Sequence, residues 1–147
     1  MSYRIPAVKL SMIRDGSVLS ARNVITQSAQ AATLCRSIIG QNDREELLAL
    51  LLDAKHKVSA VHSVSVGSLT FSLVHPREVY KAAILSNAAA LIIAHNHPSG
   101  DPTPSQEDHQ LTARLKECGT LLGIPVLDHV VLGDGERYYS FADNGTL

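Results

Sequence analysis

Two short apolar segments limit the folds open to this chain more than any other feature of its sequence. Residues 47–52 and 88–94 are continuous runs of leucine, isoleucine and alanine without a polar residue. Runs of this length fit strands that are buried on both faces, although a helix is also possible. A strand without a polar face needs packing on both sides. We therefore predict an α/β fold with a central sheet flanked by helices.

Three helices are predicted from apolar spacing and from residues typical of helix ends. The first covers residues 26–39, with Thr26 as its cap. The second has Pro76 at its first position, and the third follows a Ser105 cap and ends at Gly123. The predicted apolar stripe of the third helix consists of Leu111, Leu115, Cys118, Leu121 and Leu122. Partial alternation and turn residues predict further strands at residues 58–66, 126–132 and 137–141.

The N-terminal segment allows two interpretations. Apolar and polar residues alternate in it, at Val8, Leu10 and Met12, and a turn signal follows at Asp15 and Gly16. A small hairpin or an ordered arm is one interpretation, and a flexible arm is the other. We assign residues 1–25 to an N-terminal arm or small hairpin and residues 26–147 to a single domain, which suits a chain of this length.

The composition argues against several classes of protein. The chain carries 13 Lys and Arg against 14 Asp and Glu, and 4% of its residues are aromatic. A dedicated nucleic-acid binder has a strong basic excess, and a platform for single strands needs aromatic side chains. No apolar run approaches the roughly 20 residues that span a bilayer, so we expect no membrane association.

The N-terminus and the cysteines indicate a location. The first residues lack the long apolar run of a signal peptide. Cys35 and Cys118 lie in no CxxC pair, which predicts two buried thiols in a reducing compartment. We therefore expect a cytoplasmic protein. Its oligomeric state cannot be read from the sequence, because exposed strand edges cannot be located there.

The segment from His95 to Asp108 carries the chemistry. His95 and His97 lie two apart at the end of a predicted strand, so their side chains share one face. A loop with three prolines leads to a helix whose first turn holds Asp108. Two imidazole nitrogens, one carboxylate oxygen and an open fourth position form a catalytic zinc site. Each residue also has a structural interpretation, the histidines as buried side chains and Asp108 and Ser105 as parts of a helix cap.

The same residues reproduce a known motif. An HxH pair, seven residues, a serine, two residues and an aspartate form the JAMM motif of the JAB/MPN metalloprotease family, matched here by His95, His97, Ser105 and Asp108. The surrounding segments HPRE (75–78), HNHPSGDPTPS (95–105) and LDH (127–129) resemble the RadC branch of that family, and the similarity covers about residues 26–142. The resemblance implies a cytidine-deaminase-like α/β sandwich with a central mixed sheet. Residues 26–147 then correspond to a RadC-like MPN domain.

The resemblance also implies roles for individual residues. His95, His97 and Asp108 would bind Zn²⁺, and Ser105 would hydrogen-bond the oxygen of a tetrahedral intermediate. A glutamate just before the first core strand would be the general acid and base, which leaves Glu45 or Glu46. We prefer Glu45 from its similarity to the Arg-Glu pair of RadC-like chains. The implied function is a zinc-dependent metallohydrolase that cuts peptide or isopeptide bonds.

Two alternative functions remain open. MPN domains occur with and without the metal motif, so a non-catalytic scaffold is one alternative. The RadC name is linked with DNA repair, but nothing in the sequence itself indicates nucleic-acid chemistry, so a nucleic-acid partner stays uncertain. Two side chains near the motif are also assigned: Asn96 should point away from the ligands, and we interpret His129 as a core histidine rather than a support for the site.

Overall fold

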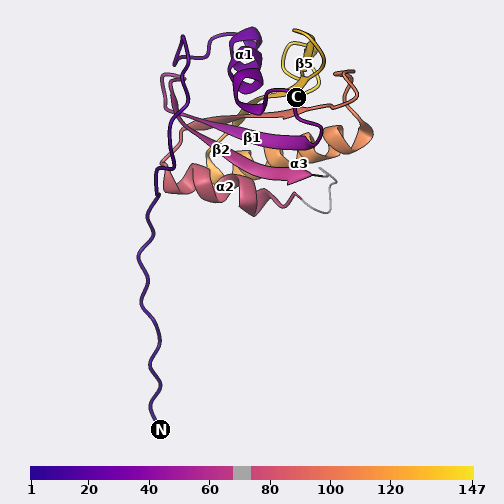
Figure 1. The fold of residues 1–147 in the computed structure, drawn as a ribbon. Helices are drawn as coiled ribbons and strands as arrows, with labels where there is room; N and C mark the ends of the chain where they lie inside the picture. Colours follow the sequence, from indigo (N-terminus) through magenta and orange to yellow (C-terminus); the bar gives the residue numbers. More distant parts are fainter. Residues whose placement is uncertain (68–73) are drawn as a thin grey trace.

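A five-stranded mixed sheet forms the centre of the computed structural model, which describes residues 1–67 and 74–147 (Figure 1). The strand order is β2-β1-β3-β4-β5, in which β3 and β4 are parallel and every other neighbouring pair is antiparallel. The strands are β1 (Glu45–Leu52), β2 (Val58–Gly67), β3 (Ala90–Asn96), β4 (Val126–Leu132) and β5 (Tyr138–Ser140). The helices are α1 (Ser28–Ile39), α2 (Pro76–Leu85) and α3 (Gln106–Leu122).

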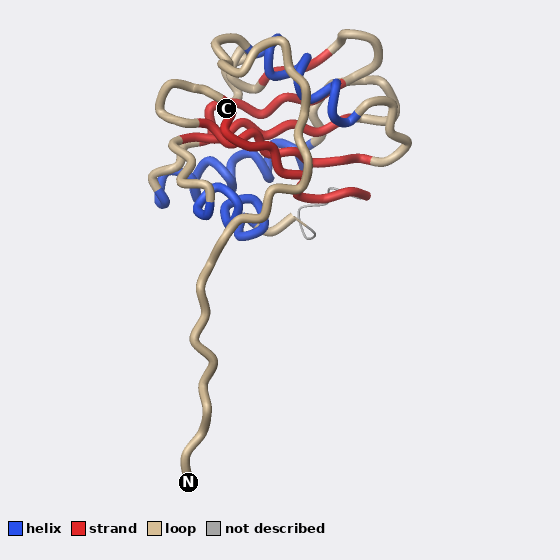
Figure 2. The backbone as a smooth tube through the Cα atoms, turned by 60° about the vertical axis from the view of Figure 1, so that its left-hand side comes forward, coloured by secondary structure: helices blue, strands red, loops and turns tan. Residues whose placement is uncertain are grey.

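Helices cover both faces of the sheet, as Figure 2 shows. Residues of α1 form one core cluster with Leu48, Leu50 and other inward side chains of the sheet. Residues of α2 and α3 form a second cluster with Leu47, Ala49 and their neighbours. We call these two sides the α1 face and the α2/α3 face. Successive residues of β1 alternate between them, so the strand is buried on both sides, and the predicted α/β architecture is confirmed.

Two details of the helices differ from the prediction. Helix α1 begins at Ser28 and not at a Thr26 cap, because the side-chain oxygen of Gln30 accepts the backbone N–H groups of Thr26 and Gln27 and holds them outside the helix. In α3, Leu121 and Leu122 are 87% and 48% exposed. The buried line of that helix is Asp108, Leu111, Thr112, Leu115 and Gly119. Leu121 lies two positions beyond that line and therefore faces away from the sheet.

Cys35 and Cys118 differ in burial. Cys35 is fully buried on the α1 face, and burial raises the pKa of its thiol to about 12. Cys118 is only partly buried, against the prediction of two buried thiols, because it lies beside the buried line of α3 and not on it. Both cysteines are free thiols.

The N-terminal segment projects away from the domain (Figure 1). Residues 1–20 contain no helix or strand and are exposed. Where the segment reaches the sheet, the carbonyl oxygen of Asn23 accepts the backbone N–H of Val58 at 2.7 Å, and Val24 forms an isolated antiparallel bridge with Lys57. Within the described parts of the chain, no helix has the length and apolar character needed to cross a membrane.

Candidate metal centre

Three side chains converge where β3 meets the start of α3. His95 is the next-to-last residue of β3, His97 follows the strand, and Asp108 lies in the first turn of α3. The Nε2 atom of His95 is 3.2 Å from Oδ1 of Asp108, and Nε2 of His97 is 3.1 Å from Oδ2. The two Nε2 atoms are 3.0 Å apart. The predicted cluster is thus assembled from a strand end and a helix start.

The helix cap aims the carboxylate at the histidines. Ser105 Oγ accepts the backbone N–H of Asp108 at 3.1 Å, and the backbone N–H of Ser105 donates to Asp108 Oδ2 at 2.8 Å. This reciprocal capping box turns the Asp108 side chain back toward the beginning of the helix, where β3 ends. Asp108 is therefore both a part of the predicted helix cap and a proposed metal ligand, and the two interpretations are compatible.

The loop between the histidines and the helix is internally braced. Asp101 Oδ1 accepts from the backbone N–H and the hydroxyl of Thr103, at 3.0 and 2.8 Å. The carbonyl oxygen of Asp101 lies 2.8 Å from Nδ1 of His97. Because a carbonyl oxygen only accepts, Nδ1 of His97 carries the proton and Nε2 presents its lone pair to the cluster. The loop thus sets the orientation and the tautomer of this histidine.

The electrostatics of the cluster favour an ionised carboxylate. Burial alone would raise the pKa of Asp108, but the neighbouring rings of His95 and His97 and the hydrogen bond from the Ser105 N–H hold that pKa far below its ordinary value. The pKa of His97 is raised, first by its hydrogen bond with Asp108 and further by the Asp101 carbonyl and the charge of Glu45, against the effect of burial. A negative charge and two imidazole nitrogens therefore meet in one partly enclosed position.

The donor set fits Zn²⁺. The ligand atoms of His95, His97 and Asp108 all lie within 4.8 Å of one another. Two imidazole nitrogens and one carboxylate oxygen are donors that zinc prefers, and three protein ligands leave a position for water or substrate. No cysteine belongs to the group, so the ion would stay more electrophilic than it would be among thiolates.

The structure separates the two candidate glutamates, both of which lie inside β1 and not before it. Leu47 pairs with His95 and packs on the α2/α3 face, and Glu45, two residues earlier, lies on that same face. Glu46 lies on the opposite face, where Oε1 accepts from the Ser63 hydroxyl at 2.8 Å. Of the two glutamates, Glu45 is therefore the one on the side of the sheet that holds the histidine–aspartate cluster.

Asn96 points away from the cluster, as predicted. Its Oδ1 accepts the backbone N–H of Glu46 at 2.8 Å, and its Nδ2 donates to the carbonyl oxygen of Arg44 at 2.9 Å. The side chain thus holds the beginning of β1 against the end of β3. It acts as a structural link on the α1 side of the strand.

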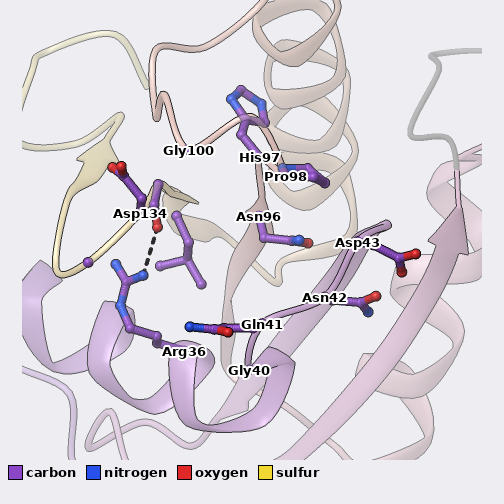
Figure 3. A pocket seen from close by; sticks show the side chains of 13 residues that line it. Arg36, Gly40, Gln41, Asn42, Asp43, Asn96, His97, Pro98, Gly100 and Asp134 are labelled. Atoms are coloured by element: carbon purple, nitrogen blue, oxygen red, sulfur yellow. Dashed lines mark hydrogen bonds between the residues drawn. The ribbon is translucent and has the colours of Figure 1, made fainter.

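A cavity of about 540 Å³ opens on that same side (Figure 3). Asn96 and His97 border it from the end of β3, and Gln41 borders it from the segment after α1. Arg36 of α1 donates to the carbonyl oxygen of Gly133 at 2.8 Å beside it. The cavity therefore meets the candidate metal centre only along the edge formed by His97.

His129 has a larger part than the sequence interpretation assigned to it. It is completely buried, as a core histidine would be, but its Nε2 lies 2.7 Å from Nδ1 of His95. Its Nδ1 lies 2.5 Å from the hydroxyl of Thr112, which sequence reasoning missed entirely. The available signal was spacing, since Thr112 lies one helical turn after Asp108 and so shares its face of α3. Burial lowers the pKa of His129 well below its ordinary value.

The other histidines lie outside the cluster. His75 caps α2, with its Nδ1 accepting the backbone N–H of Arg77 at 3.1 Å. His109 is exposed and contacts the edge of the Phe141 ring. These positions agree with their sequence interpretations as a helix start and a side chain directed elsewhere.

Comparison with known proteins gives a consistent result. The family described as RadC-like JAB domain matches residues 25–146. Proteins named UPF0758 are similar to the chain: one from Rubrobacter xylanophilus is 45% identical over 141 residues, and one from Trichlorobacter lovleyi is 50% identical over 122 residues. These matches cover 96% and 83% of this chain, and 60% and 53% of the respective relatives. The chain thus spans little more than half the length of these relatives.

Proposed function

Because this chain belongs to the family of RadC-like JAB domains, we propose that it is a zinc-dependent metallohydrolase that cleaves peptide or isopeptide bonds. One observation carries the proposal: the ring nitrogens of His95 and His97 and the carboxylate of Asp108 converge at distances of 3.0 to 3.2 Å. The family match alone would suit a scaffold equally well, but a scaffold has no need for such a donor set. The proposal concerns only the part of the longer relatives that this chain matches.

The three ligand residues have distinct tasks. His95 and His97 supply neutral donors from the end of a buried strand, which limits their movement. Asp108 supplies the negative charge and is held in place by its own helix cap. A zinc ion held by these residues would lower the pKa of a coordinated water toward about 7 and would polarise the substrate carbonyl. The fold contributes a preformed set of donors, so little ordering is needed at binding.

Glu45 is the proposed general base and acid. It lies on the α2/α3 face of β1, two residues from the Leu47 that pairs with His95, and its charge raises the pKa of His97. From there its carboxylate would accept a proton from the attacking water and return it to the leaving nitrogen. Such proton transfer contributes about 10²–10⁴-fold to a rate.

Ser105 is the proposed hydrogen-bond donor to the developing negative oxygen. Its Oγ accepts the Asp108 N–H, which places the hydroxyl at the start of α3 next to the ligand cluster. The hydroxyl proton is free of that bond, since an oxygen that accepts can also donate. A donor of this kind is worth about 10²–10³ in rate.

The location and partners are part of the same proposal. A peptide or isopeptide substrate follows from the family chemistry, and a cytoplasmic location is supported by the two free thiols. No basic excess supports a nucleic-acid partner, since Lys and Arg number 13 against 14 Asp and Glu.

Two measurements on the purified chain test the proposal. We expect one zinc per chain by mass spectrometry of the metal content, and cleavage of members of a peptide library or a library of Nε-lysyl isopeptides. His97→Ala should remove both metal and cleavage. Absence of zinc from the wild-type chain, even after incubation with excess zinc, would instead support the scaffold alternative. Steeply salt-dependent DNA binding without cleavage would support the DNA-associated alternative.

A further inference from the structure

We propose that Thr112 and His129 form a hydrogen-bonded relay that places the proton of His95 on Nδ1 and leaves the lone pair of Nε2 directed at the metal centre. The relay joins three elements: His95 belongs to β3, His129 to β4 and Thr112 to α3. It deepens the proposed function, because the lone pair matters only if the cluster binds a cation. Thr112 and His129 are positioning residues, since neither belongs to the ligand group.

The direction of the relay is decided at Thr112. Its Oγ lies 2.7 Å from the carbonyl oxygen of Asp108, one helical turn earlier. Two oxygens at this distance need a proton between them, and only the hydroxyl has one to give. Thr112 therefore donates to Asp108 and offers lone pairs elsewhere. Nδ1 of His129, at 2.5 Å from the same Oγ, must then be the donor of that contact.

The next step follows from the single proton of a neutral imidazole. His129 is fully buried, and its two nitrogens face a hydroxyl and another imidazole, neither of which carries a negative charge. With its proton on Nδ1, the ring has an acceptor at Nε2. Nδ1 of His95 lies 2.7 Å from that acceptor and must donate to it. His95 therefore has no proton on Nε2, the atom that faces Asp108 and His97.

Packing keeps the central ring of the relay in place. His129 stacks on Phe141 with ring centroids 4.9 Å apart and an interplanar angle of 10°. Its strand pairs with β3 so that His129 lies opposite Ile93, and its side chain therefore shares a face with His95. The ring is thus held on its flat side and at both nitrogens.

The relay opposes a competing state of the cluster without a cation. If His95 carried its proton on Nε2, it would donate to the ionised Asp108 at 3.2 Å, and the cluster would satisfy itself without a cation. The relay makes that state costly, because Nδ1 of His95 would then face the lone pair of His129 Nε2. His97 is prevented from the same change by the backbone carbonyl of Asp101. The tautomer of His97 thus depends on a loop carbonyl, and that of His95 depends on the hydrogen-bonded side chains that begin at Thr112 in α3.

The first test reads the tautomer in the wild-type chain without metal. Nitrogen-15 NMR of the imidazoles, at about pH 8.5 and so above the ordinary histidine pKa of about 6.5, distinguishes a protonated ring nitrogen from a bare one. We expect protonated Nδ1 and bare Nε2 at His95, and the same pattern at His129. A proton on Nε2 of His95 overturns the proposal, and this measurement needs no variant that might fail to fold.

The second test uses Thr112→Val with Thr112→Ser as its matched control. Valine keeps the shape of threonine but lacks the hydroxyl, whereas serine keeps the hydroxyl. We expect Thr112→Val to lower zinc affinity by about 10- to 100-fold, the usual effect of losing a partner that orients a ligand, and to shift the His95 proton toward Nε2. Thr112→Ser should retain the wild-type tautomer and affinity within about threefold. Zinc affinity is measured by competition with a chromophoric chelator.

Equal zinc affinities for the valine and serine variants would contradict the relay. The outcome is separable from that of the proposed function, because neither readout uses a substrate. A chain with the expected tautomers and zinc affinities but no cleavage keeps the relay and removes the hydrolase. A chain that cleaves peptides with its metal-free His95 protonated on Nε2 keeps the hydrolase and removes the relay.

Discussion

Where β1 begins and β3 ends, neighbouring polar residues have different roles on the two faces of the sheet. On the α2/α3 face, His95 belongs to a group whose ligand atoms lie within 4.8 Å of one another, and Glu45 lies on the same face. On the α1 face, Glu46 and Asn96 take part in hydrogen bonds that connect the two strands. Residues adjacent in sequence therefore serve chemistry on one side and strand association on the other.

The difference arises from what each face receives from outside the sheet. The start of α3 brings a carboxylate and a capping serine to the α2/α3 face. The segment after α1 brings the backbone carbonyl of Arg44 to the α1 face, where the amide of Asn96 satisfies it. The side-chain amide of Asn96 already uses its oxygen and nitrogen in hydrogen bonds to the backbone. The imidazole lone pairs beside the Asp108 carboxylate, in contrast, can bind a cation. The comparison can be tested residue by residue.

The largest effect is expected from the ligands themselves. Asp108→Asn removes the negative charge and should abolish stoichiometric zinc binding and all detectable hydrolysis, because a neutral amide is a poor zinc ligand. Metal content after dialysis and cleavage rate are the measurements. The wild-type chain should also gain thermal stability on adding zinc, by mass action, and the variant should not. A variant that still holds one zinc per chain would show that the convergence of these side chains has another purpose.

The next effect distinguishes the two glutamates. Glu45→Gln should retain zinc but lose about 10²–10⁴-fold in kcat, since an amide cannot carry the proton. Glu46→Gln is the matched control from the other face and should keep the wild-type kcat. Steady-state kinetics with a substrate found in the library screen gives both values. If Glu46→Gln alone were inactive, the assignment of faces to functions would be reversed.

A smaller loss is expected at Ser105, which belongs to both the cap and the site. Ser105→Ala should lower kcat by about 10²-fold through the lost donor and cost about 1 kcal/mol of stability through the lost cap. Ser105→Thr keeps a hydroxyl and should recover most of both. Kinetics and urea unfolding measure the two effects separately. Unchanged kcat in the alanine variant, with only the stability loss, would reduce Ser105 to a helix cap.

The smallest effect on the chemistry is expected on the α1 face. Asn96→Ala leaves the Glu46 N–H and the Arg44 carbonyl without their partner, so the free energy of unfolding should fall by about 1–3 kcal/mol. Zinc content should remain one per chain, because no ligand is touched. Urea denaturation and metal analysis on the same sample report both quantities. Loss of zinc in this folded variant would mean that the two faces are coupled and not separate.

Much of the fold and site was predictable from local patterns. The two apolar runs indicated doubly buried strands, and β1 and β3 have that burial. The serine followed three residues later by an aspartate predicted the cap of α3, and both reciprocal bonds are present. In each case the local backbone geometry of a strand or a helix start determines the direction of a side chain from its position in the sequence. These features could therefore be predicted without knowing the tertiary contacts.

Other features depended on segments that are distant in sequence. The sequence left Glu45 and Glu46 as alternatives. Alternation along the strand places them on opposite faces, but only the packing of α3 shows which face carries the metal ligands. Thr112 and His129 lie 17 positions apart and meet only after β4 has paired with β3. Leu121 and Leu122 continue an apolar pattern but lie beyond the part of α3 that packs on the sheet.

The sequence by itself therefore determined the elements of this protein and the order of its donor residues, because both follow from the repeat of the backbone and from spacing along it. The tertiary structure decided which face each polar residue serves, which histidine supports another and which leucines are covered. Those outcomes depend on strand register and on helix packing, and both are settled by contacts between segments that the sequence keeps apart.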